Sequence, residues 1–288
     1  MTQVKEGAFT IKIFVPGGTP DGLRLLEKSN WTGLGLVCPR SVFPEAKGED
    51  EFGRTGVYIL EGRSEQSELP TIYVGQGDCL RDRLSQHYGQ KDFWDRVVLF
   101  VSKDDSLNRA HVQYMEAQLV ERALEVKRSN VENRAVPQRP NLSAPDEADV
   151  KSFLADVLSI LPLVGLTAFE RPHKKVRKRE LFVIDSKGIR AQGGEVPEGF
   201  LVLASSQAVA KEVPSVPVTV SNLRRDLQEQ GVLVMEAARL RFMQDYSFNS
   251  PSLAAGVVLG RSANGRVEWM NTEDQTLKEV QEAAVPAE

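Results

Sequence analysis

The chain has 288 residues, 41% hydrophobic and 26% charged, which is enough for one large domain or two ordinary ones with proper cores. Its net charge of -4 argues against a protein that coats nucleic acid through bulk electrostatics, so contacts with nucleic acid would need local basic patches. The two cysteines and three scattered histidines provide neither a disulfide framework nor a zinc cluster.

We expect a cytoplasmic protein with no membrane partner. The first residues lack the long apolar core of a signal peptide. The most apolar stretch, residues 153–169, is interrupted by Asp156 and Pro162, which argues against a membrane span.

The first half of the chain alternates short strands with helices. Residues 1–52 are predicted to form a strand-rich extension that begins with the alternating segment 9–15. Strands are expected at 56–60, 71–75 and 97–101. Asp78 is expected to cap a helix that reaches His87, and Ser106 a long helix that reaches Val126.

The second half is predicted to hold a linker and a smaller α+β domain. A helix over 148–161 precedes a basic run at 171–179 that resembles a linker. Strands at 181–184 and 200–204, a helix at 221–230, a helix start at Ser250–Pro251 and a hairpin turn at Asn264–Gly265 predict a second domain over 181–278. Between the N-terminal extension and the second domain we place a central core at residues 53–135, followed by the helix and the linker at residues 136–180.

Two strand-like segments each carry a tyrosine, in Gly56–Leu60 and Thr71–Gly75. Side chains alternate along a strand, so Tyr58 and Tyr73 lie on one face if the strands pair as a hairpin. Ordinary packing of aromatic residues is the alternative explanation.

The helix that follows offers groups suited to a phosphate. Arg83 and His87 are four residues apart, at the border of an apolar stripe formed by Leu80 and Leu84, so their side chains lie together. Arg83 could instead be an ordinary surface arginine, and Arg81 on the same helix serves as the comparison for that possibility. His87, taken alone, could be an ordinary residue at the edge of the apolar stripe.

Glu116 falls within the apolar face of the long helix. Burying an unpaired carboxylate costs several kcal/mol, so Glu116 should be protonated, paired with a cation or bound to a metal. A single carboxylate is how proteins usually hold Mg²⁺, together with water and substrate phosphates. A structural pair with a buried arginine remains an alternative.

Together these residues resemble the GIY-YIG nuclease family. The likeness covers about residues 53–135, because Gly56-Val57-Tyr58, Tyr73-Val74-Gly75, Arg83, His87 and Glu116 keep the family's order and spacing. Both triplets carry valine for isoleucine, and the gap between them is somewhat longer than usual. The resemblance implies a three-stranded antiparallel sheet flanked by helices, which hydrolyses phosphodiester bonds with one divalent metal, Mg²⁺ or Mn²⁺.

The resemblance also implies a role for each residue. Tyr58 would be the general base, Arg83 would stabilise the phosphate, and Glu116 would hold the metal, while His87 and Tyr73 would complete the site. An asparagine often follows the long helix; Asn133 is the candidate, and Asn130 and Asn141 compete with it. The basic run could add phosphate contacts through Lys174, Lys175 and Arg177, although a solvated linker explains it as well.

Further segments resemble a prokaryotic architecture in which a C-terminal domain of unknown function follows the nuclease. They include Ser29–Gly33, Pro39–Ser41, Lys91–Trp94 and Asp245–Ser252. We therefore expect a magnesium-dependent endonuclease that acts on DNA. A catalytically silent nucleic-acid-binding or regulatory protein on the same scaffold, or a nuclease for RNA, are the alternatives.

Overall fold

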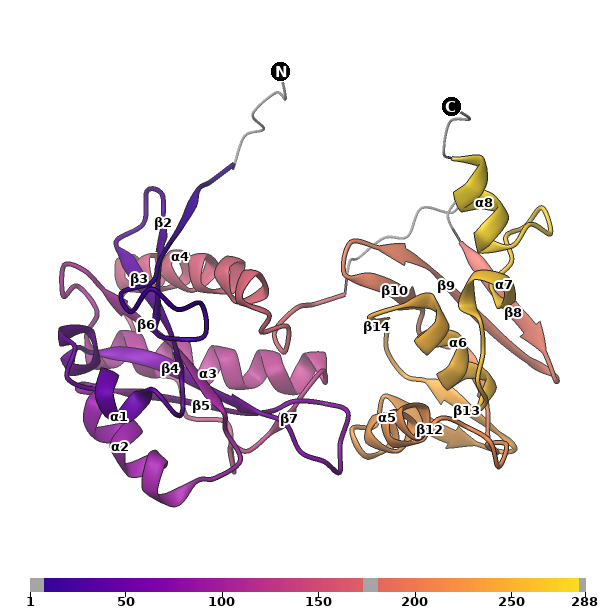
Figure 1. The fold of residues 1–288 in the computed structure, drawn as a ribbon, viewed down its shortest axis with the longest axis horizontal. Helices are drawn as coiled ribbons and strands as arrows, with labels where there is room; N and C mark the ends of the chain where they lie inside the picture. Colours follow the sequence, from indigo (N-terminus) through magenta and orange to yellow (C-terminus); the bar gives the residue numbers. More distant parts are fainter. Residues whose placement is uncertain (1–7, 173–180, 285–288) are drawn as a thin grey trace. The chain divides into compact units, whose positions relative to one another are not determined.

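The computed structural model describes residues 8–172 and 181–284. The chain divides into an N-terminal unit, Met1–Ser64 with Leu69–Glu170, and a C-terminal unit, Glu65–Glu68 with Arg171–Glu288. Both units contain strands and helices (Figure 1), which confirms a mixed α+β protein. No helix in the described ranges is long and apolar enough to cross a membrane.

Residues 8–172 contain one sheet of seven strands in the order β1-β2-β3-β6-β4-β5-β7. The strands are β1 (Ile11–Phe14), β2 (Arg24–Lys28), β3 (Gly33–Pro39), β4 (Gly56–Gly62), β5 (Thr71–Gly77), β6 (Arg96–Ser102) and β7 (Asn130–Val131). The neighbours β6, β4 and β5 are antiparallel. They lie inside a larger sheet because β3 pairs with β6 along its whole length, so the predicted extension continues the same sheet.

Helices cover both faces of this sheet (Figure 1). The helical segments of this unit are α1 (Phe43–Ala46), η1 (Asp50–Gly53), α2 (Leu80–Gln90), α3 (Arg109–Val126), α4 (Ala144–Ile160) and η2 (Leu161–Val164). Val57 and Ile59 of β4 pack in the core with α3 and α4, whereas Tyr58 and Leu60 pack in the core with α1 and α2. The strand alternation thus places Tyr58 on the α2 face.

Three helix starts differ from their predictions. Cys79, not Asp78, is the N-cap residue of α2. Asn108 caps α3 by accepting a hydrogen bond from the His111 amide, because Ser106 is already bonded to Ser102 in the preceding turn. Helix α4 begins at Ala144, since Ser143 caps it and a proline is tolerated in the first turn.

Two smaller sheets form the C-terminal unit within residues 181–284. One has the order β14-β10-β9-β8 and the other β11-β13-β12. The strands are β8 (Phe182–Ser186), β9 (Ile189–Val196), β10 (Gly199–Val202), β11 (Gln207–Val209), β12 (Leu233–Glu236), β13 (Arg239–Phe242) and β14 (Tyr246–Phe248). The helices are α5 (Val218–Glu229), α6 (Pro251–Leu259), α7 (Gly265–Glu268) and α8 (Leu277–Ala283).

Two predicted turns in this unit have different outcomes. Ser250 caps α6 and Pro251 is its first residue, which confirms the predicted helix start. The hairpin turn at Asn264–Gly265 is wrong: Asn264 is the N-cap of α7 and accepts a hydrogen bond from the Arg266 amide. Asparagine is favoured both in turns and at helix N-caps, so the sequence alone did not distinguish the two. The short helix α7 ends at Trp269, which is buried.

Candidate active site

Tyr58 and His87 form the buried centre of the candidate site. Tyr58 is fully buried on β4, and its hydroxyl lies 2.7 Å from Nε2 of His87, which is itself buried on α2. The ring of Tyr73, on β5, meets the His87 ring edge-on with 5.0 Å between ring centres, and its centre lies 6.3 Å from that of the Tyr58 ring. The two tyrosines therefore share a face, and α2 supplies the histidine between them.

Two glycines of β5 make room for these side chains. Gly75 pairs with Tyr58 across the strands, and a Cβ at Gly75 would lie only 2.3 Å from the Tyr58 hydroxyl oxygen. A Cβ at Gly77 would lie 2.9 Å from Cγ of Arg83. The phenol and the arginine stem thus rest directly on strand backbone, which only glycine permits.

His87 is neutral at pH 7, because burial, aided by the charges of Arg83 and Lys91, lowers its pKa to about 4. Within the described residues its Nδ1 is buried and has no hydrogen-bond partner. An unpaired buried N–H is rarer in proteins than an unpaired acceptor. The favoured tautomer therefore carries its proton on Nε2 and donates it to the oxygen of Tyr58, a hydrogen bond that favours the phenolate.

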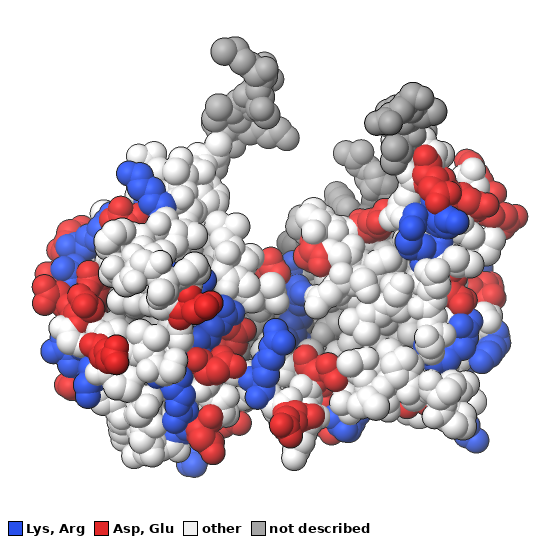
Figure 2. All heavy atoms as spheres, in the orientation of Figure 1, with Lys and Arg blue, Asp and Glu red and all other residues white. Residues whose placement is uncertain are grey.

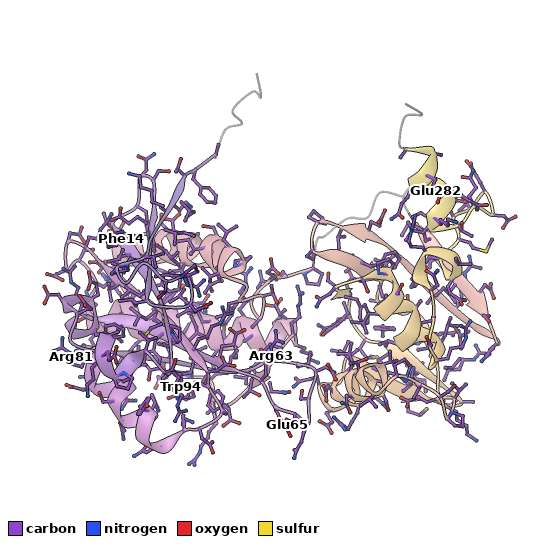
Figure 3. The ribbon with its side chains drawn as sticks, in the orientation of Figure 1. Phe14, Arg63, Glu65, Arg81, Trp94 and Glu282 are labelled. Carbon is purple, nitrogen blue, oxygen red and sulfur yellow. The ribbon has the colours of Figure 1, made fainter. Side chains whose placement is uncertain are left out.

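Arg83 is exposed on α2, and its guanidinium makes a weak contact, 3.4 Å, with the Gln86 side chain. Arg81, its neighbour on the same helix (Figure 3), differs: it donates to the carbonyls of Lys47 and Glu49 and so fixes the segment after α1. Arg83 instead lies at the site: its charge and a side-chain hydrogen bond to Tyr58 both lower the pKa of that phenol, against the larger effect of burial.

Glu116 is half-buried on α3 and lines an open pocket of 490 Å³. The pocket is lined by Gln76, Gln113, Glu116 and residues 137–141. Over residues 8–172 and 181–284 the carboxylate has no hydrogen bond or ion pair, and burial raises its pKa to about 7 against the opposing charge of Arg83. It is therefore not the partner of a buried arginine.

The charges link Glu116 to the tyrosines although α3 packs on the opposite face of the sheet. Burial chiefly raises the pKa of Tyr58 and of Tyr73, the charge of Glu116 raises both further, and Arg83 lowers both. The site thus surrounds the part of β5 beyond its short pairing with β7, with the phenols on one side and the carboxylate on the other.

The residues around Glu116 fit a magnesium ion. Mg²⁺ is held by one or two carboxylates and keeps several waters and substrate phosphate oxygens, which an open pocket with amide groups from Gln76 and Gln113 permits. No group of three His, Cys, Asp or Glu side chains that could hold a metal occurs in the described part of the chain.

The other predicted substrate-binding residues divide into two sets. The Asn133 side chain accepts from the Val74 amide at 3.0 Å and donates to the Val74 carbonyl at 2.8 Å. It extends the pairing of β7 with β5 and so supports the strand that carries the site. Lys174, Lys175 and Arg177 lie outside the described residues.

Lys91 and Arg40 were not predicted as site residues. Nζ of Lys91 lies 4.6 Å from the centre of the Tyr73 ring, and Arg40 binds the backbone of the segment that carries Lys91. Arg40 lies in Pro39–Ser41 and Lys91 in Lys91–Trp94, two segments that the sequence analysis used only to identify the domain architecture. Because their contacts are with residues far away in the sequence, the spacing of neighbouring residues could not predict them.

Comparison with known families concerns the C-terminal unit. Residues 182–281 match a family described as a domain of unknown function (DUF4357), in agreement with the predicted C-terminal domain of unknown function. Neither the curated proteins nor the solved structures provided a match. The resemblance of residues 53–135 to GIY-YIG nucleases stays a prediction.

Proposed function

We propose that the N-terminal unit is a magnesium-dependent endonuclease that hydrolyses phosphodiester bonds in DNA. The observation that carries this proposal is the gathering around one strand of a hydrogen-bonded Tyr58–His87 pair, the guanidinium of Arg83, and Glu116, which has no ion pair among the described residues. Each of these groups has a separate task in the hydrolysis of a phosphodiester.

Tyr58 is proposed as the base that takes a proton from the attacking water. Its pKa, raised mainly by burial, makes an unaided phenolate costly. The Nε2–H of His87 and the charge of Arg83 both favour negative charge on the phenol oxygen. The phenol first loses its own proton to solvent and then takes one from the attacking water as the water oxygen bonds to phosphorus. The bond from phosphorus to the leaving oxygen breaks, and that oxygen takes up a proton from solvent.

Arg83 is proposed to bind the scissile phosphate, and Glu116 to hold one divalent cation. A bound Mg²⁺ would neutralise negative charge on the phosphate oxygens. Because Glu116 lies close enough to Tyr58 and Tyr73 to raise both pKa values, a cation there would act on the phenols in the opposite direction.

Lys174, Lys175 and Arg177 are proposed to add phosphate contacts outside this centre. Figure 2 shows acidic and basic side chains interspersed over the visible face, consistent with the net charge of -4. Affinity for DNA would then come from a few placed cations, as the composition suggested.

A cleavage panel tests the proposal. Duplex, flap and single-stranded DNA, with matching RNAs, are incubated with the full chain with and without Mg²⁺ or Mn²⁺. We expect metal-dependent cleavage of DNA that Tyr58→Phe and Glu116→Gln each reduce at least about 100-fold.

Tyr88→Phe and Glu45→Gln are the matched controls, because both side chains are exposed in the same unit. Equal cleavage by the site variants and wild type would reject the proposal. Binding without turnover would favour the silent scaffold, and cleavage of RNA alone would change the substrate.

A further inference from the structure

Lys91 carries a charge that no acidic side chain in the described part of the chain neutralises. It follows α2 directly, and its Nζ lies 4.6 Å from the ring centre of Tyr73 and 5.7 Å from that of Phe93. Among the described residues the ammonium makes no hydrogen bond or ion pair with a side chain. Contact with an aromatic face at a partly exposed site is worth only about 0.5–1 kcal/mol, so the cation is available to an anion.

The backbone beneath Lys91 is held by Arg40. Its guanidinium donates to the carbonyls of Lys91 at 2.5 Å, Tyr88 at 3.0 Å and Trp94 at 3.4 Å. It also stacks over the rings of Tyr88 at 5.0 Å and Trp94 at 4.8 Å. The planar fork of donors satisfies carbonyls at the end of α2, which a lysine cannot do as a set.

The segment that carries Lys91 also packs closely on β4. A Cβ at Gly62 would lie only 1.8 Å from the carbonyl oxygen of Phe93, and the Asp95 amide donates to the Glu61 carbonyl at 2.9 Å. Trp94, which belongs to this segment (Figure 3), is almost fully buried. These contacts fix the backbone near Lys91 and with it the position of this residue beside Tyr73.

The charge of Lys91 acts on the site itself. It contributes, after burial and Arg83, to the lowered pKa of His87. Arg83 and Lys91 lie toward opposite ends of α2, eight residues apart, which corresponds to roughly 12 Å along a helix axis. Lys91 can therefore reach a phosphate of the same strand other than the one that Arg83 binds.

We propose that Lys91 is a second phosphate-binding cation of this site, which contacts a phosphate of the DNA strand flanking the scissile one, and that Arg40 is the positioning residue that holds it there. This inference rests on the proposed function, because it takes the DNA backbone as the ligand.

Salt dependence of binding tests the contact with Lys91. Fluorescence anisotropy of the full chain with a labelled DNA of the form it binds most tightly is measured in EDTA from 50 to 200 mM KCl. Loss of one phosphate contact should reduce the slope of log Kd against log salt by about 0.9 for a duplex, or about 0.7 for a single strand. We expect this from Lys91→Met, restoration by Lys91→Arg, and no change from Lys12→Met, an exposed lysine on the far edge strand β1.

Arg40→Lys tests the positioning role. It keeps the charge and should reproduce the smaller slope of Lys91→Met, and the double variant should be no worse than Lys91→Met alone. In Lys91→Met the pKa of His87, followed by NMR, should rise from about 4. That titration reports on the placement of Lys91 whether or not Arg40→Lys folds.

The outcomes separate the two proposals. An unchanged slope in Lys91→Met, or no DNA binding by wild type, overturns the Lys91 contact. A slope that depends on Lys91 without cleavage in Mg²⁺ overturns the nuclease and leaves the contact standing. Cleavage with an unchanged slope overturns only the contact.

Discussion

Replacing Gly75 with alanine tests the packing on which the site depends. The added Cβ would lie 2.3 Å from the hydroxyl oxygen of Tyr58, 2.4 Å from Cζ and 3.0 Å from Cε1. Tyr58 is fully buried, so its ring cannot move into solvent and must displace its neighbours. The 2.7 Å contact with His87 would be lost in that movement.

The cost follows from these contacts. Overpacking of this kind costs about 1–3 kcal/mol and a lost hydrogen bond about 1 kcal/mol. Alanine recovers about 0.4–1 kcal/mol by restricting the unfolded chain. We therefore expect Gly75→Ala to lower the free energy of unfolding of the N-terminal unit by about 1–3 kcal/mol.

Urea denaturation followed by tryptophan fluorescence measures this change. Trp31 and Trp94 report on the N-terminal unit. Trp269, in the C-terminal unit, is replaced by phenylalanine in both the wild-type and the Gly75→Ala chain, so that its fluorescence does not contribute. Gly89→Ala is the control, since its Cβ would meet no atom within 4 Å and alanine favours a helix by about 0.5–1 kcal/mol. A Gly75→Ala chain as stable as wild type would refute the close approach of the phenol.

Two further predictions concern Glu116 and Asn133. The pKa of Glu116 lies near 7, above the ordinary 4.5, so the folded chain binds this proton more tightly than the unfolded chain. Stability should fall as the pH rises from about 4.5 to 7, by about 1–2 kcal/mol after allowance for solvent screening, and Glu116→Gln should remove this fall. Urea midpoints at pH 4.5 and 8 without metal measure it, and identical pH profiles would contradict it. Asn133→Ala removes both bonds to Val74 and should cost about 1–2 kcal/mol, with faster hydrogen exchange of the Val74 amide; Asn141→Ala should leave that amide unchanged.

Much of the candidate site could be predicted because periodicity records local burial. Alternation along a strand placed Tyr58 and Tyr73 on one face, and the helical repeat placed Arg83 beside His87. Glu116 stood out because a carboxylate interrupts the apolar pattern of α3. The structure refines this last point, since Glu116 is half-buried at a pocket and not enclosed in the core.

The end of each helix was less predictable, because several residues compete for one cap. Ser106 and Asn108 are both good N-cap residues. Asn108 caps α3 because Ser106 is engaged with Ser102 at the end of β6. That competition depends on a turn whose geometry the local sequence does not specify.

The sequence by itself determined the two-part α+β organisation, the helices and strands that carry the site, and the shared face of the tyrosines. The tertiary structure alone decided that the N-terminal strands join the same sheet, that Glu116 shares a pocket with Gln76 of β5, and that Arg40 binds the backbone of Lys91 beside Tyr73. The physical reason is that residue patterns encode which side of an element is buried. Contacts between distant segments depend on which strand edges pair and how closely backbones approach, as at Gly62 and Gly75.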